Sequence, residues 1–165
     1  MSFARSLIKE AKIELQLKFW ESLLHSLESK GYNFIFYDSN NSKSLKKAIT
    51  KYYEKRKNIR HYGIRYGIDK NLDVYVEINH QIYFGFSTFN EHDIKPFKID
   101  ELNIHWDDSG KWYYLNFPTK QLNFEAFNNE NILNLVNEET RNNDVNIIAD
   151  DIVNIIDKYK DRNSI

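Results

Sequence analysis

The chain has 165 residues, a formal net charge of -1, 28% charged and 41% hydrophobic residues, and no cysteine. This length is enough for one domain with a substantial core, and the lack of cysteine excludes disulfides, thiolate metal sites and cysteine nucleophiles. It also favours a reducing compartment, so we expect a cytoplasmic protein. No segment has the unbroken apolar run of a signal peptide or a membrane span, so we expect no membrane partner.

Charge is unevenly distributed along the chain. Between residues 43 and 60, eight lysines and arginines stand against a single carboxylate, Glu54, whereas acids dominate from Glu125 onwards. This distribution predicts a molecule with a basic side and an acidic side.

The first third of the chain is typical of a helix, a strand and a second helix. From residue 3 to about residue 30, apolar residues recur every four positions, which predicts one long amphipathic helix closed by Gly31. Residues 32–37 form an aromatic and β-branched run that predicts a short strand. A second helix should begin near Ser42 and carry the basic residues of segment 43–60 opposite its apolar face.

The centre of the chain changes to a period of two. Residues 62–68, 72–78 and 81–89 alternate and are joined by turns too short for a parallel crossover, which predicts an antiparallel meander. Residues 91–108 are acidic and irregular, and residues 111–117 predict a further strand that Pro118 stops.

Two helices should finish the chain. Asn128 or Asn129 can cap one that runs through Ile132, Leu133 and Val136, and an apolar stripe over residues 145–159 predicts the other. The expected fold is a single α+β domain over residues 1–165: an antiparallel meander of four to five strands with helices packed on one face.

The patterns of common catalytic and metal sites are missing or incomplete. We find no nucleophile elbow and no phosphate-cradling glycine loop. His92 and His105 lie near Asp93, Asp107 and Asp108, but their spacing matches no established metal site. The sequence therefore predicts no metal and no cofactor.

Two acids on one strand come closest to a nuclease signature. A metal-dependent nuclease needs a carboxylate pair on a hairpin with a lysine two residues after the second acid. Asp73 and Glu77 share a strand and a face, but position 79 is asparagine. We interpret both acids as outward-facing polar positions and predict a protein that is not an enzyme.

Three groups of segments resemble a known region. They are Leu17–Glu21 with Leu23, Leu27 and Gly31-Tyr32; Tyr62–Ile64 with Ile82–Phe86; and Leu122–Phe124 with Phe127-Asn128, Ile132–Leu135 and Ile148–Ile152. Together they resemble the C-terminal accessory region of a family of large bacterial PD-(D/E)XK nuclease-superfamily proteins. The resemblance spans nearly the whole chain, through aromatic and packing positions.

The resemblance implies an accessory module without its nuclease. In that family the metal-binding acids and the lysine precede this region, and no position here matches them. The family is similar to components of bacterial restriction or phage defence. A free-standing copy is then expected to act as an accessory subunit, a decoy or an inhibitor.

The first functional hypothesis is a protein-interaction subunit or inhibitor that acts on a nuclease or another defence complex. Charge asymmetry and an aromatic-rich sheet favour it, because aromatic residues are common anchors of protein interfaces. The acidic stretch could imitate the charge of a nucleic acid. The residues expected at this interface are Trp106, Asp107, Asp108 and Trp112.

Two alternatives remain open. A nucleic-acid-binding or sensing module would neutralise phosphates with its basic helix and stack a base on an exposed tyrosine. A diverged nuclease would use Asp73, Glu77 and a lysine from elsewhere. The residues expected for nucleic-acid binding are Lys43, Lys46, Lys47, Lys51, Lys55, Arg56, Lys57, Arg60 and Tyr62.

Overall fold

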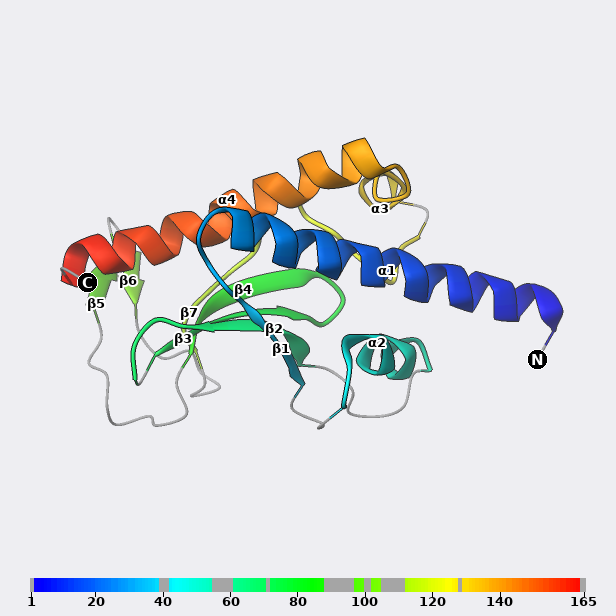
Figure 1. Cartoon of the computed structure of the whole chain (residues 1–165), viewed down its shortest axis with the longest axis horizontal. Helices are drawn as coiled ribbons and strands as arrows, with labels where there is room; N and C mark the ends of the chain where they lie inside the picture. Colours follow the sequence, from blue (N-terminus) through cyan, green and yellow to red (C-terminus); the bar gives the residue numbers. More distant parts are fainter. Residues whose placement is uncertain are drawn as a thin grey trace.

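A computed structural model describes residues 2–38, 42–54, 61–70, 72–87, 97–99, 102–104, 112–127 and 129–163. In chain order the elements are α1 (Phe3–Ser29), β1 (Ile35–Asp38), α2 (Leu45–Tyr53), β2 (Tyr62–Gly67), β3 (Asp73–Ile78), β4 (Ile82–Ser87), β5 (Phe97–Ile99), β6 (Leu102–Ile104), β7 (Trp112–Asn116), α3 (Glu130–Leu133) and α4 (Glu138–Asn163). Figure 1 shows their arrangement.

Five strands form one antiparallel sheet, in the order β1-β2-β3-β4-β7. The register sets Ile64 opposite Val76, and Val76 opposite Phe84. Strands that follow one another along the chain are therefore neighbours through β4, as the short turns predict. The expected α+β class with an antiparallel meander is confirmed.

Two long helices cover one face of the sheet. Figure 1 shows α1 and α4 side by side and running in the same direction across it. Val74, Val76 and Ile78 on β3 are fully buried, as are Trp20 on α1 and Ile152 on α4. Because alternate strand residues point to one face, the alternation that predicts the strands also supplies the apolar layer beneath the helices.

The apolar stripe of α1 does not lie on one face, which corrects the expectation of a simple amphipathic helix. Four residues turn an α-helix by slightly more than one turn, so a spacing of four winds about 40° around the axis at every step. Leu23 and Leu27 at the end of the stripe are fully buried, whereas Leu7 near its start is 49% exposed.

Several element boundaries differ from the expected ones. The stretch 91–108 contains a short hairpin, β5 with β6, where we expected irregular chain. Helix α3 has only four residues, and α4 extends the expected 145–159 stripe at both ends. Helix α2 ends at Tyr53, well before residue 60.

Among the described residues, no helix combines the length and apolar character needed to cross a membrane.

Candidate binding surfaces

The basic helix α2 is held in place by several of its own charges. Ser44 caps it by accepting a hydrogen bond from the Lys47 backbone N–H. Lys46 Nζ lies 2.9 Å from Glu14 Oε1 on α1, and Lys51 Nζ donates to Ser42 Oγ at 2.9 Å. Two of the four described lysines of the expected interface therefore already have partners within the chain. The other two described lysines, Lys43 and Lys47, are exposed. The rest of the expected basic residues lie outside the described residues: Lys55, Arg56, Lys57 and Arg60.

Tyr62 does not provide an exposed stacking surface, and this part of the prediction is wrong. It points to the helix-covered face of the sheet and is fully buried. Its hydroxyl donates to Gln16 Oε1, and its ring lies 6.3 Å from the Trp20 ring. Burial raises the pKa of Tyr62 well above that of a free phenol. The residue is a core element that binds α1 to the sheet.

The nuclease-like acids belong to a polar network on the opposite face of the sheet. Glu77 is 5% exposed and accepts a 2.7 Å hydrogen bond from the Tyr83 hydroxyl. His61 Nδ1 lies 3.5 Å from Glu77 Oε2. Glu77 therefore lies on the outward face, away from the helices, as expected, but its side chain is buried there.

Asp73 has separate partners at the other end of β3. Its Oδ2 atom lies 3.5 Å from Arg65 Nη1 and accepts from the Tyr75 hydroxyl at 3.3 Å. Burial raises the pKa of the Asp73 carboxyl, although Arg65 opposes the shift. Both acids thus bind side chains of the same sheet. The described part of the chain also contains no group of three or more histidines or acids placed to hold a metal.

The expected protein-interaction residues fall largely outside what the structure describes. Trp106, Asp107 and Asp108 lie outside the described residues, as do His92 and His105. Trp112 opens β7, where its backbone pairs with Ser87 of β4 next to a register shift. The assignment of these residues to an interface stays a prediction.

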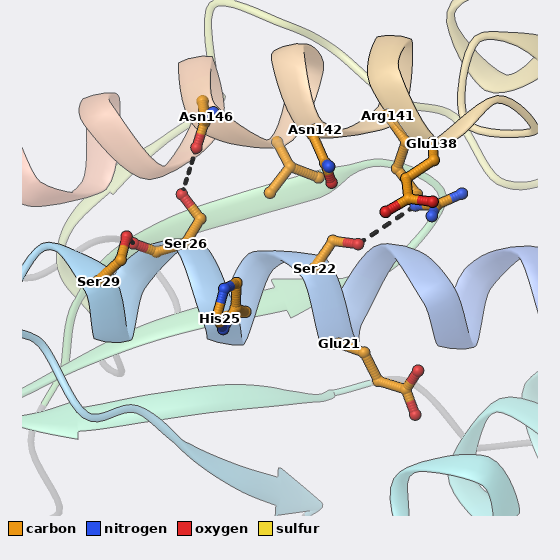
Figure 2. Close-up of a pocket in the computed structure, with 10 residues that line it drawn as sticks. Glu21, Ser22, His25, Ser26, Ser29, Glu138, Arg141, Asn142 and Asn146 are labelled. Atoms are coloured by element: carbon orange, nitrogen blue, oxygen red, sulfur yellow. Dashed lines mark hydrogen bonds between the residues drawn. The ribbon is translucent and has the colours of Figure 1, made fainter.

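A polar groove separates α1 from the first half of α4 (Figure 2). Its volume is about 460 Å³. Ser26 Oγ donates to Asn146 Oδ1 at 2.6 Å, and Arg141 Nε donates to Ser22 Oγ at 3.2 Å. Hydrogen bonds from the small serines of α1 thus join the two helices across this groove.

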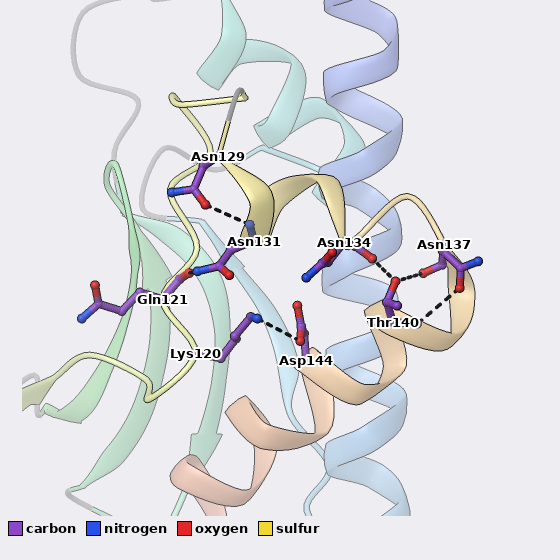
Figure 3. A network of polar contacts seen from close by, with 8 residues as sticks. All are labelled: Lys120, Gln121, Asn129, Asn131, Asn134, Asn137, Thr140 and Asp144. Atoms are coloured by element: carbon purple, nitrogen blue, oxygen red, sulfur yellow. Dashed lines mark hydrogen bonds and ion pairs between the residues drawn. The ribbon is translucent and has the colours of Figure 1, made fainter.

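The turn between α3 and α4 is fixed by asparagine caps (Figure 3). Asn129 accepts from the Asn131 backbone N–H at 2.9 Å, and Asn137 accepts from the Glu139 backbone N–H at 2.9 Å. Thr140 Oγ1 donates to the Asn134 carbonyl. These bonds satisfy backbone groups at two successive helix starts and hold the turn in one shape.

Five of the large exposed apolar side chains lie on the first half of α1 and on the segment that joins α3 to α4. Phe3, Leu7 and Ile8 on α1 are 82%, 49% and 57% exposed, and Leu133 at the end of α3 and Val136 in the turn after it are 54% and 66% exposed. We call these five residues the apolar end. Figure 1 shows the first half of α1 extending past both α3 and the start of α4.

Sequence reasoning missed the apolar end, although the chain carried a signal for it. Leu7 and Ile8 lie 18 residues before His25 and Ser26. Eighteen residues are about five helical turns, so such pairs lie along one line of the helix. One face of α1 therefore changes from apolar to polar between its two halves.

No family model, curated protein or solved structure matches the chain. The resemblance to the nuclease-associated region therefore stays a prediction.

Proposed function

We propose that the chain is a non-catalytic protein-interaction module that binds a partner through the apolar end. The observation that carries this proposal is the exposure of Phe3, Leu7 and Ile8 on the first half of α1, and of Leu133 and Val136 shortly before α4. Monomeric proteins rarely leave large apolar side chains grouped in contact with water, and such groups usually mark protein interfaces.

The helix and turn that carry these side chains support the same proposal. Ser2 caps α1, and the asparagine caps fix the α3–α4 turn, so the apolar side chains stand on ordered backbone. A preorganised surface loses little conformational entropy when a partner binds. Lys9 Nζ lies 3.0 Å from Glu54 Oε1, which ties this half of α1 to the end of α2.

A nucleic-acid interface is less well supported. Tyr62 is buried, and Lys46 and Lys51 bind Glu14 and Ser42. Phosphate contacts at those lysines would have to replace existing bonds, and no base can stack on Tyr62. We rank this alternative second and the diverged nuclease third, since Asp73 and Glu77 already bind side chains of the sheet.

The biological setting is proposed from the resemblance alone. A cysteine-free accessory module without a nuclease core fits a cytoplasmic subunit or inhibitor in bacterial defence or phage counter-defence. Its partner would then be a nuclease or another protein of a defence complex.

The test compares capture of proteins from the natural host by the wild-type chain and by two single variants, Leu7→Glu and Val136→Glu. A matched control is Ile35→Glu, because Ile35 is 56% exposed on the edge strand β1. We expect the same identified protein to be captured by the wild type and the control, and to be lost with both apolar-end variants.

Two outcomes would contradict the proposal. One is capture of every bound protein at equal yield by all four chains, which would place binding elsewhere. The other is salt-sensitive binding of DNA or RNA that disappears with Lys47→Glu and persists with Leu7→Glu, which would favour the nucleic-acid module.

A further inference from the structure

The side chains around Glu77 lie on the face of the sheet opposite α1 and α4. The register places Tyr37, Gly63, Glu77 and Tyr83 side by side across β1, β2, β3 and β4. Glu77 is only 5% exposed, although acids are rarely buried to this extent without a basic partner. The burial of this acid therefore requires a physical reason.

The contacts of Glu77 satisfy only one of its two carboxylate oxygens. The Tyr83 hydroxyl donates to Oε2 at 2.7 Å, and His61 Nδ1 lies 3.5 Å from the same atom. Within the described part of the chain, Oε1 accepts no hydrogen bond, and no lysine or arginine pairs with Glu77. His61 is the only basic side chain there in ion-pair range, and an imidazole is charged only when it is protonated. A buried acceptor is thus left for a further partner.

The backbone of His61 gives a second, independent indication. Its φ is 80°, in the left-handed region that costs free energy for a residue with a side chain. Its Nδ1 atom lies 3.3 Å from the Tyr83 hydroxyl, so His61, Tyr83 and Glu77 form one cluster. Backbone strain of this kind is concentrated at binding and catalytic sites. Burial of the acid and strain at its neighbour therefore both point to a binding site.

An aromatic ring lies beside the carboxylate. Gly63 carries no side chain, and the Tyr37 ring of β1 lies across β2, with its centroid 5.1 Å from that of Tyr75 on β3. Burial, followed by the negative charge of Glu77, raises the pKa of the Tyr37 hydroxyl, so this ring is within electrostatic range of the carboxylate. A carboxylate next to an aromatic ring is an arrangement that attracts organic cations.

We propose that Glu77 and Tyr37 form a binding site for an alkylammonium group. The ammonium N–H donates to Glu77 Oε1, and the Tyr37 ring contacts the cation, while Tyr83 and His61 hold the carboxylate through Oε2. An ammonium group fits because one carboxylate oxygen and one ring are sufficient for it, whereas a metal ion prefers several oxygen ligands. The site is separate from the apolar end, so the inference goes beyond the proposed function and does not depend on it.

The first experiment titrates the full chain with n-butylammonium chloride and follows the backbone amide signals by nuclear magnetic resonance. We expect saturable shifts in β1 to β4, with a dissociation constant on the order of 1 mM for so small a ligand. n-Butanol has the same alkyl chain without the charge and should bind at least about tenfold more weakly. Sodium chloride at the same ionic strength is the control for screening.

Two glutamate variants test the carboxylate. Glu77→Gln keeps the shape of the side chain but removes its charge, so the dissociation constant should rise at least about tenfold. The matched control is Glu125→Gln, because Glu125 also lies beside a histidine, 2.7 Å from His80 Nδ1, but is exposed. The control should bind n-butylammonium as the wild type does. Circular dichroism should show the same helix content in both variants.

Two substitutions at Tyr37 test the ring. Tyr37→Phe keeps an aromatic ring, so the dissociation constant should change little. Tyr37→Leu removes the ring and should raise the dissociation constant by roughly threefold. Equal affinity in the wild type, Tyr37→Leu and Glu77→Gln would place the amine elsewhere and overturn the inference.

The last ligand separates two sources of the ammonium group, which are a free amine and a lysine side chain of another protein. Nα-acetyl-lysine methyl ester carries the same charged group on a peptide-like frame. Tighter binding than n-butylammonium would assign the site to a lysine side chain, and weaker binding would assign it to a free amine. No saturable shift with either ligand overturns the site. Capture of a host protein through the apolar end is measured separately, with Leu7→Glu, and its result leaves this inference unaffected.

Discussion

Gly63 occupies a position in the sheet where a side chain has no room. It lies on β2 between Tyr37 of β1 and Glu77 of β3. A Cβ atom built there would lie 1.9 Å from the Val76 carbonyl oxygen, which belongs to the backbone and cannot rotate away. Glycine is therefore required for the strands to approach, and its backbone φ is not positive.

Gly63→Ala should lower the free energy of unfolding by about 3 kcal/mol, because the backbone must shift to accept the extra carbon. The matched control is Gly67→Ala on the same strand, where the Cβ would meet only the Asp73 side chain at 3.3 Å. Urea unfolding of both variants measures the difference. Equal loss in the two variants would indicate that the contact with Val76 does not set the cost.

Tyr62 illustrates what alternation along a strand leaves undecided. Alternation predicts that Tyr62, Ile64 and Tyr66 share a face, and they do. It does not say which face the helices cover, because that depends on contacts far away in sequence. The hydroxyl of Tyr62 reaches Gln16 across 46 residues, and no local pattern predicts that bond.

At the scale of elements, local signals predicted the sheet and the helices well. Short turns specify the meander from β2 to β4, and Pro118 follows the end of β7 as expected. The exposure of Phe3, Leu7 and Ile8 on the first half of α1 could not be predicted in this way, because it depends on where α4 begins beside α1. The β5–β6 hairpin was also missed, since strands of three residues give almost no periodic signal.

The start of α4 depends on Asn137. Its side-chain oxygen accepts from the backbone N–H groups of Glu139 and Thr140 at 2.9 and 3.3 Å. Asn137→Ala should lower the free energy of unfolding by about 1 kcal/mol, as loss of an N-cap usually does, whereas Asn137→Asp should retain most of it. Thermal unfolding followed by circular dichroism measures both. A stable Asn137→Ala variant would mean that Thr140 holds the turn without the cap.

At the scale of the whole molecule, aromatic residues join the layers. The Tyr32 and Tyr159 hydroxyls donate to Asp157 and Asp69, and Tyr52 donates to the Asn79 carbonyl at 2.8 Å. Burial is the largest cause of a raised phenol pKa throughout this group. The pKa values are raised for Tyr32, Tyr37, Tyr53, Tyr62, Tyr75, Tyr83 and Tyr159.

These shifts predict cooperative alkaline unfolding. A phenol ionises near pH 10 in the unfolded chain, whereas in the fold the pKa of Tyr159 is about 12 and others are also raised. The unfolded state therefore loses protons first as the pH rises. The contribution of these tyrosines to the free energy of unfolding is fully present below about pH 10. It is lost as the pH rises towards the pKa values in the folded state, by up to about 1.4 kcal/mol per pH unit for each tyrosine.

The measurement follows tyrosinate absorbance and far-ultraviolet circular dichroism in one alkaline titration. We expect both signals to change together, because buried phenols can ionise only when the packing that buries them is lost. The Tyr37→Phe variant is a control, because the substitution removes one phenol with a raised pKa while the phenylalanine ring can keep the edge contact with Tyr75. The free energy of unfolding of this variant should fall less steeply with pH than that of the wild type. Tyrosinate formation while the helix signal stays constant would show that the phenols ionise within the intact fold, contrary to the burial argument.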